Sequence, residues 1–418
     1  MKGSKGTVGL APLPKGAVEV AGGVTAARGF LASGTAAGVK SEAGKTDLMV
    51  LLADRPAAWG ATFTTNRMAA APVALGRELL AAGGRLQAVV VNSGNANAAT
   101  GAEGKRRARQ VTAAAARVLE MPPGRVLVSS TGIIGRQLPA GKIVAAIPAA
   151  VAALAPDGGP AAAAAIMTTD TFPKSFALEA RIGGGVVRVG GMTKGAGMIH
   201  PRMATMLAYL TTDAKVAQPV LRRILRGAVE RTFNRVSIDG DRSTNDTALL
   251  MAGGASGVAI PAHGVAHERF AALVTTVCAR LARMIVLDGE GMTKLVEITV
   301  TGAASDAEAL RAADAIANSP LVKTAWYGQD LNWGRMVAAA GYAEVRLDPA
   351  RISVTLNGLP VVRRGRGVEG KSFARAAAEM KKKELAFTVG LGVGKGSDRI
   401  LTCDLTDTYV RINADYPT

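Results

Sequence analysis

A glycine-rich stretch at residues 190–213, GGMTKGAGMIHPRMATMLAYLTTD, places a small residue directly before a threonine, at Ala204-Thr205. Glycine adopts backbone conformations that other residues avoid and lets a carbonyl group be approached closely. In a tight bend, the Thr205 hydroxyl could attack the Ala204 carbonyl and shift the acyl group from nitrogen to oxygen. Cleavage would leave Thr205 with a free α-amine, whose pKa of roughly 7.7–8.0 suits a general base. The pattern indicates a self-cleaving enzyme, although glycine loops before Ala-Thr also form ordinary turns.

A nucleophile of this kind carries its base in the same residue, so no histidine partner is required. The chain has three histidines and two cysteines, Cys278 and Cys403. These few side chains argue against a structural zinc site and a disulfide scaffold. We interpret His200, in the glycine-rich loop, as a structural or solvated residue rather than a catalytic one. We therefore expect an enzyme without a metal or an organic cofactor.

The chain is strongly basic, with 50 Lys and Arg against 32 Asp and Glu and a net charge of +18. A nucleic-acid partner therefore has to be considered. Apart from short runs at Lys105–Arg107, Arg363–Arg366 and Lys381–Lys383, the basic residues are spread along the chain, and no aromatic residues are interleaved with those runs. This distribution predicts a solvated basic surface rather than a nucleic-acid interface.

Membrane and secretory signals are not visible in the sequence. No apolar run reaches the length of a membrane span, and the N-terminal MKGSKGTVGLAPLPKG lacks the continuous apolar core of a secretory signal. We expect no membrane partner and a reducing compartment. That compartment is the cytoplasm, or the plastid or mitochondrial matrix if the N-terminus is a targeting remnant.

Glycine-punctuated β-like segments alternate with alanine-rich helical segments, which predicts a mixed α/β or α+β fold. The expected helices cover 103–120, 141–154, 216–232, 267–283, 308–317 and 370–380. The expected strands cover 88–91, 126–129, 185–189, 248–252, 296–300, 351–356 and 387–389. Apolar segments on both sides of the Ala204-Thr205 bond predict two parts, residues 1–204 and 205–418.

Three other patterns do not meet the requirements of the sites they suggest. VGLGVGKGSD at 389–398 has neither the first glycine of a phosphate loop nor Ser or Thr after its lysine. The calcium-loop-like segment that begins at Asp239 has Thr244 in place of the turn glycine and Leu250 in place of the last glutamate. HGVAH at 263–267 has no glutamate after its first histidine. We expect all three to be structural.

The segment KGAGMIHPRMATMLAYLTTDA resembles the processing site of the ornithine acetyltransferases, a family of N-terminal-nucleophile enzymes. The resemblance implies a layered sandwich of helices and sheets with two intertwined domains. It extends over nearly the whole chain, because seven further segments match that family in the same order. These are VNSGNANAATG (91–101), STGIIGRQLP (130–139), MTTDTFPK (167–174), SIDGDRSTNDT (237–247), DGEGMTK (288–294), LVKTAWYGQDLNWGR (321–335) and NADYPT (413–418).

The resemblance assigns chemical roles to two segments. Thr205 matches the family's nucleophile and new N-terminus, with cleavage after Ala204. Thr131 and Gly132 match the oxyanion hole, where a hydroxyl and a backbone N–H stabilise the charge that develops during acyl transfer. Loss of one such donor raises the barrier by roughly 3–4 kcal/mol.

Further residues match substrate-binding positions. Lys194, which we expect to lie in a loop, can neutralise a substrate carboxylate. Thr171 is the preferred contact within TTDT, with Thr168 and Thr169 as alternatives. Taken alone, Lys194 would be an ordinary solvated lysine.

The C-terminal half supplies the remaining matches. Glu290 resembles the residue that receives the amino groups of the substrate, while Asn413 and Thr418 match C-terminal positions that reach back to the site. Two departures from the family weaken the comparison. His200-Pro201-Arg202 brings basic residues close to the cleavage point, and Pro417 removes a backbone donor beside Thr418.

The function implied is transfer of acetyl from N-acetylornithine to glutamate through an acetyl-Thr205 intermediate, in the cyclic route of arginine biosynthesis. The family also implies that the two fragments stay together and pair into a heterotetramer. Acetyl-CoA as a second acetyl donor remains open. Two alternatives are a self-processing aminopeptidase with the same nucleophile and a basic nucleic-acid-binding protein without catalysis.

Overall fold

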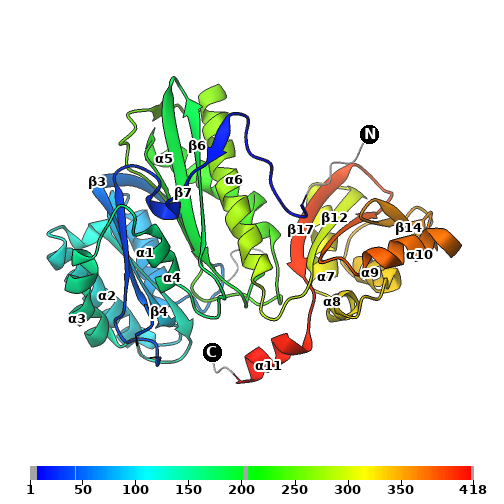
Figure 1. The fold of residues 1–418 in the computed structure, drawn as a ribbon, viewed down its shortest axis with the longest axis horizontal. Coiled ribbons are helices and arrows are strands. Elements are labelled where there is room, and N and C mark those ends of the chain that lie inside the picture. The colour runs from blue at the N-terminus through cyan, green and yellow to red at the C-terminus, as the bar shows by residue number, and fades with distance from the viewer. Residues whose placement is uncertain (1–6, 43, 201–205, 416–418) are drawn as a thin grey trace. The chain divides into compact units, whose positions relative to one another are not determined.

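The computed structural model describes residues 7–42, 44–200 and 206–415 (Figure 1). Ala204, Thr205 and Thr418 lie outside these ranges, as do Pro201, Arg202 and Pro417. The described chain forms two compact units. The larger unit contains residues 11–234 and 241–285, and the smaller unit contains residues 7–10, 235–240 and 286–415.

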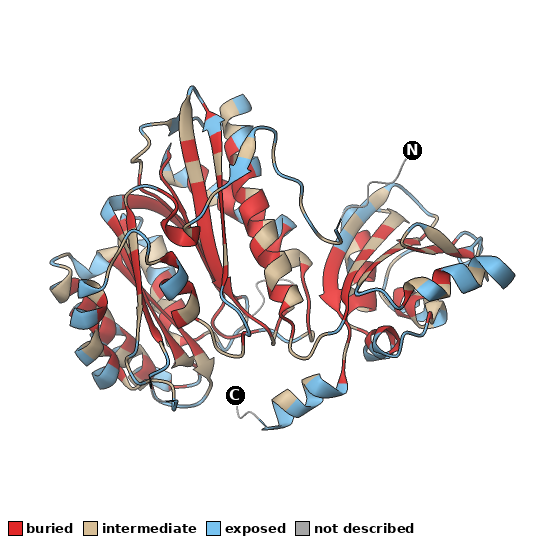
Figure 2. Ribbon diagram, in the orientation of Figure 1, coloured by how far each residue is buried: buried red, intermediate tan, exposed pale blue. Residues whose placement is uncertain are grey.

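A nine-stranded sheet forms the centre of the larger unit, in the order β1-β6-β7-β8-β10-β3-β4-β5, with β2 paired to β3. Its strands are β1 (Ala17–Glu19), β2 (Phe30–Thr35), β3 (Leu48–Phe63), β4 (Leu86–Asn95), β5 (Val126–Ile133), β6 (Lys174–Ile182), β7 (Gly185–Lys194), β8 (Leu207–Thr212) and β10 (Thr247–Ala252). Several of these strands are buried on both faces, and every residue of β8 and β10 is buried (Figure 2). Burial on both faces is the reason that their apolar runs do not alternate with polar residues.

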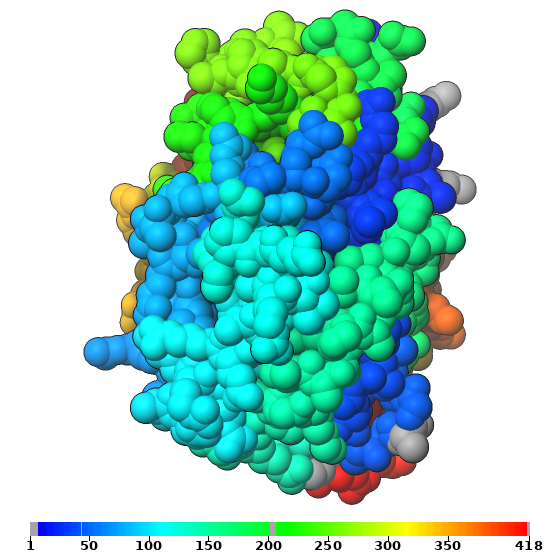
Figure 3. Space-filling view, turned by 90° about the vertical axis from the view of Figure 1, so that its left-hand side faces the viewer, coloured from blue at the N-terminus to red at the C-terminus, as the bar shows by residue number. Residues whose placement is uncertain are grey.

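Helices cover both faces of this sheet. They are α1 (Ala71–Ala81), α2 (Gly101–Val118), α3 (Ala140–Ala152), α4 (Gly159–Ala165), α5 (Gln218–Arg231) and α6 (Val265–Leu287), with a small sheet of β9 (Lys215–Val216) and β11 (Ala259–Ile260) and 3-10 turns η1 (Gly23–Thr25), η2 (Pro123–Arg125) and η3 (Phe233–Arg235). The apolar faces of α2 and α3 pack on β3, β4 and β5. α4 and η1 pack on the opposite face of the sheet. The cyan to blue-green surface in Figure 3 belongs to the part of the chain that includes α2 and α3.

α6 is long and apolar enough to cross a membrane by length and composition. It corrects our expectation that no segment meets that test. In the structure α6 packs on the central sheet: Arg280 stacks over the ring of Phe176 in β6, and Phe270, Leu273 and Val277 are fully buried. More than half of its apolar window is buried, which is the behaviour of a core helix.

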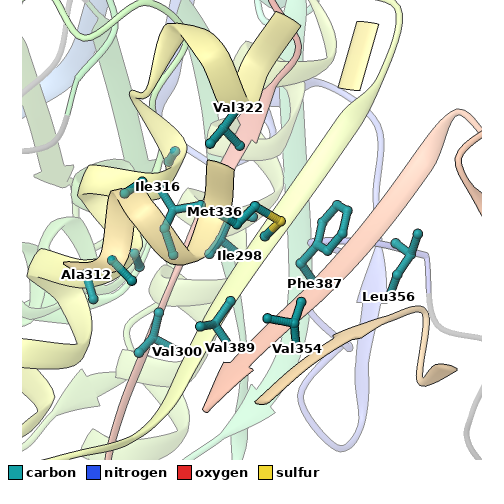
Figure 4. Packing of buried hydrophobic residues seen from close by; sticks show 14 of the residues in the cluster. Ile298, Val300, Ala312, Ile316, Val322, Met336, Val354, Leu356, Phe387 and Val389 are labelled. Carbon is teal, nitrogen blue, oxygen red and sulfur yellow. The ribbon is translucent and has the colours of Figure 1, made fainter. Parts of the chain in front are cut away.

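The smaller unit contains a six-stranded sheet in the order β15-β14-β13-β16-β12-β17. Its strands are β12 (Leu295–Ala303), β13 (Ser353–Leu356), β14 (Leu359–Arg363), β15 (Arg366–Gly367), β16 (Glu384–Gly390) and β17 (Gly396–Cys403), and its helices are α7 (Asp306–Ala317), α8 (Pro320–Tyr327), α9 (Trp333–Gly341), α10 (Gly370–Glu379) and α11 (Asp407–Asp415). Buried and half-buried residues alternate along β13 and β16, so one face of the sheet is covered. Figure 4 shows Ile298, Val354, Phe387 and Met336 packed together between strands and helices.

All six expected helices and all seven expected strands are present, with ends shifted by a few residues. The mixed α/β fold is confirmed, with helices layered on sheets. The two compact units do not coincide with the parts 1–204 and 205–418. The boundary at the Ala204-Thr205 bond concerns cleavage rather than packing, and it stays a prediction.

Candidate active site

Thr131 and Gly132 lie near the end of β5, where this strand runs parallel to β4. Gly132 has a φ of +129°. A Cβ atom at this position would lie 2.4 Å from the carbonyl carbon of Gly94, so any side chain would collide with the backbone of β4. Both the left-handed backbone and the close approach require glycine here. The STG segment is therefore a crowded strand end rather than an ordinary turn.

A network of buried asparagines supports this strand end. Ser130 donates to Oδ1 of Asn92 over 2.6 Å, and Nδ2 of Asn92 donates to the carbonyl of Asn95 over 2.9 Å. Nδ2 of Asn95 donates in turn to the carbonyl of Arg136 over 3.2 Å. The segments VNSGNANAATG and STGIIGRQLP thus form one hydrogen-bonded structure. The asparagine side chains supply donors and acceptors that the irregular backbone needs.

A buried cluster of charges surrounds Asp170. Nζ of Lys174 lies 2.6 Å from Oδ1 of Asp170, and Nζ of Lys194 lies 4.0 Å from its Oδ2. The backbone amides of Gly195 and Thr168 also donate to this carboxylate. Burial by itself would raise the pKa of Asp170, but the two lysines and the Gly195 amide together lower it to about 2. The ammonium groups of Lys174 and Lys194 are therefore buried close to one carboxylate.

Lys194 is the last residue of β7 and is only 3% exposed. This corrects our expectation that it lies in a loop. Its register partner in β8 is Leu207. Lys194 therefore lies beside the beginning of the strand that follows Thr205 in the chain. The preferred threonine, Thr171, is exposed in a bend.

Asp246 lies on the other side of β8. Its neighbour Thr247 is the register partner of Leu207, and the backbone amide of Met206 donates to Oδ1 of Asp246 over 3.1 Å. Burial raises the pKa of Asp246 well above its usual value, and the Met206 amide, Ser243 and Lys194 offset only part of this effect. Burial therefore disfavours the charged form of the Asp246 carboxyl.

Glu290 lies in a turn of the smaller unit between α6 and β12. Thr406 ties this turn to the C-terminal segment by donating to the carbonyl of Gly291 over 2.8 Å. Nδ2 of Asn413, in α11, donates to Oε2 of Glu290 over 2.8 Å. Two of the predicted substrate-binding residues are thus in direct contact.

The structure places the predicted residues in two sets. Thr131, Gly132 and Lys194 belong to the larger unit, as does Thr171, while Glu290 and Asn413 belong to the smaller one. Their roles remain predictions. Within the described ranges, no group of three or more His, Cys, Asp or Glu side chains is arranged to hold a metal ion.

Sequence reasoning did not single out Asp170 or Asp246. Both are in segments that resemble the family, MTTDTFPK and SIDGDRSTNDT, so the resemblance marked the right places. We assigned only Thr171 in the first and examined the second only as a calcium loop. An aspartate within a run of small and polar residues was the available signal for Asp246.

The crowded strand end at Gly132 and the buried Lys194 beside the start of β8 are compatible with an acyltransferase. A model of the ArgJ family matches residues 31–418. The "Arginine biosynthesis bifunctional protein ArgJ" of Symbiobacterium thermophilum is 48% identical over 401 residues, covering 96% of this chain and 99% of that protein. A chloroplastic protein of the same name from Populus trichocarpa is 43% identical and covers 97% of this chain and 86% of its own.

The solved structure of an ornithine acetyltransferase complexed with ornithine, from Mycobacterium tuberculosis, is 40% identical with a TM-score of 0.41, covering 44% of this chain and 98% of that one. The family model and the full-length relatives agree with each other. This chain belongs to the ArgJ family, whose members are acetyltransferases of arginine biosynthesis.

Proposed function

We propose that the chain cleaves itself between Ala204 and Thr205 and then transfers acetyl from N-acetylornithine to glutamate. The observation that carries the proposal is the pairing of Lys194 with Leu207. It puts a buried ammonium group beside the strand that begins just after Thr205. An amino-acid carboxylate bound there would be attracted by the Lys194 ammonium group.

In the first half-reaction the Thr205 hydroxyl attacks the acetyl carbonyl, and the α-amine of Thr205 accepts the hydroxyl proton. The Thr131 hydroxyl and the Gly132 N–H stabilise the oxyanion. The amide C–N bond then breaks, and ornithine leaves with the proton that the α-amine returns. In the second half-reaction the amino group of glutamate attacks the acetyl ester, and the Thr205 hydroxyl is restored.

The same nucleophile serves both half-reactions because ornithine and glutamate share an α-amino-acid head. A carboxylate such as Glu290 suits the cationic amino groups of ornithine, and Asn413 donates to the Glu290 carboxylate within the smaller unit. Kinetics with acetylornithine and glutamate should therefore be ping-pong. No metal or organic cofactor takes part.

We also propose acetyl-CoA as a second acetyl donor, since the full-length relatives are named bifunctional proteins. The two fragments remain together as a heterodimer that pairs into a heterotetramer. The compartment is the cytoplasm or, in a plant-type relative, the plastid.

The decisive test is intact mass and N-terminal sequencing of the purified protein. We expect fragments of residues 1–204 and 205–418, with an acetyl group on the second fragment after incubation with acetylornithine. Thr205→Ala should give one uncut, inactive chain. Peptide hydrolysis without an acetylated fragment would favour an aminopeptidase, and an intact, active wild-type chain would end the proposal.

A further inference from the structure

Asn245 and Asp246 are neighbours in the chain, and each contacts a different part of the proposed active site. Nδ2 of Asn245 donates to the carbonyls of Ser130 and Ala96, both over 2.7 Å. Ser130 is the residue directly before Thr131. On the other side, Asp246 accepts the backbone amide of Met206, the residue directly after Thr205.

Both side chains are held firmly. Asn245 is 5% exposed and Asp246 is fully buried. Thr244 donates to Oδ1 of Asn245 over 2.6 Å, and Ser243 accepts the Asn245 backbone amide over 2.9 Å. Asparagine has two donors on one nitrogen, and here both reach backbone carbonyls of the oxyanion region. These hydrogen bonds therefore restrict the movement of Asn245.

Asp246 is costly for the fold. Burying a carboxyl group is unfavourable, and burial raises the pKa of Asp246, with Ser243 and Thr64 offsetting part of that effect. What the carboxyl provides is one fixed acceptor at the start of β8, and an apolar residue here would leave the Met206 amide without that acceptor.

We propose that Asn245 and Asp246 are positioning residues that hold the nucleophile strand in a fixed relation to the oxyanion loop. This inference rests on the proposed function. Asn245 fixes the peptide that leads into Thr131 and Gly132, while Asp246 fixes the peptide that follows Thr205. Because the two are adjacent, a single rigid dipeptide sets the distance between nucleophile and oxyanion hole. A misplacement of about 1 Å in such a geometry costs on the order of 100-fold in rate.

The test compares Asp246→Ala with Asp246→Asn. Alanine removes the acceptor, whereas asparagine keeps an acceptor oxygen in a side chain of similar shape that cannot ionise. We expect Asp246→Ala to slow self-cleavage at least about tenfold and to lower kcat of the cut enzyme about 100-fold, with KM changed less than about twofold. Asp246→Asn should restore both rates to within about fivefold of wild type.

Asp213 provides a matched control at the opposite end of β8. It is also a fully buried aspartate that accepts a backbone amide, from Arg188 over 2.9 Å. Asp213→Ala should reduce the melting temperature but leave cleavage rate and kcat within about threefold of wild type. Far-UV circular dichroism and melting curves check that each variant is folded.

Wild-type rates in folded Asp246→Ala would overturn the proposal. So would an Asp246→Asn variant as slow as Asp246→Ala, because the ionisable carboxyl rather than the acceptor would then be needed. If Asp246→Ala does not fold, Asn245→Ala decides by the same measurements, with a fall in kcat at constant KM as the supporting result. If wild type itself stays uncut, the proposed function fails; if wild type cuts and these variants match it, only this inference fails.

Discussion

At the residue scale, two constraints require glycine at position 132: its left-handed backbone angle and the lack of space for a Cβ atom. Gly135 has a similar left-handed backbone, with a φ of +84°, but no atom lies within 4 Å of the position that its Cβ would take. A substitution at position 135 therefore tests the effect of the left-handed backbone alone. A substitution at position 132 tests that effect together with the collision of a Cβ atom with β4.

We predict that Gly132→Ala lowers kcat about 100-fold by displacing an oxyanion donor, a loss of roughly 3 kcal/mol of transition-state stabilisation. Steady-state kinetics on the cut enzyme would measure this. Gly135→Ala should cost about 1 kcal/mol of stability or less, with unchanged kcat. Equal kcat values for Gly132→Ala and Gly135→Ala would contradict the assignment of Gly132 to the oxyanion hole.

A second residue-scale prediction concerns Asp170, whose folded pKa is lowered to about 2. A carboxylate with a depressed folded pKa stabilises the fold above its unfolded pKa of roughly 3.9, and this contribution is lost as the pH falls from there. Asp170→Asn removes the carboxylate that pairs with two buried lysines, so it should destabilise the protein by about 3–5 kcal/mol at neutral pH. The difference in melting temperature from wild type should narrow between about pH 4 and pH 2. If the difference in melting temperature between wild type and Asp170→Asn is constant with pH, the charge of Asp170 does not contribute to stability.

At the scale of elements, the C-terminal helix α11 contacts the turn that carries Glu290. Its docking depends on side chains rather than on a buried apolar face, because none of its residues is buried. Arg411 and Asn413 are both exposed on this helix, and among the described residues Arg411 forms an ion pair with Asp407 of the same helix. The two residues therefore offer a matched comparison.

We predict that Asn413→Ala raises KM for acetylornithine about tenfold while kcat changes little, because the orientation of Glu290 is lost. Arg411→Ala should leave both values within about twofold, as expected for an exposed ion pair. Initial-rate measurements over a range of acetylornithine concentrations distinguish the two. An unchanged KM in Asn413→Ala would remove Asn413 from the substrate site.

At the scale of the whole molecule, the predicted fragments share one sheet. β8 and β10 belong to 205–418, and they lie between β7 and β3, which belong to 1–204. Six register pairs join β8 to β7, and six more join β10 to β3. Cleavage before Thr205 would thus release no element from the sheet.

We therefore predict that the two fragments co-elute in size-exclusion chromatography at neutral pH and separate only in denaturant. The physical reason is that separation would expose backbone donors and acceptors along one edge each of β7, β8, β10 and β3. Fragments that part spontaneously in dilute buffer would contradict this topology. An uncut Thr205→Ala chain serves as the control for elution volume.

The sequence by itself determined the family, the six helices we named and the residue types of the oxyanion loop. These depend on apolar periodicity and on ordered short motifs, which are local in the chain. It did not reveal strands such as β3 and β8, because β3 contains Pro56 and β8 is buried on both faces, so neither shows simple alternation.

Only the tertiary structure decided which residues surround Lys194, why position 132 must be glycine, and that Asn245 and Asp246 join two distant segments. Burial and strand order arise from contacts between residues far apart in the chain, and no short window of sequence contains them. The opposite pKa shifts of Asp170 and Asp246 follow from the same cause. Both aspartates are buried, but the pKa of Asp170 is lowered by two nearby lysines and the Gly195 amide, whereas burial outweighs the groups around Asp246 and raises its pKa.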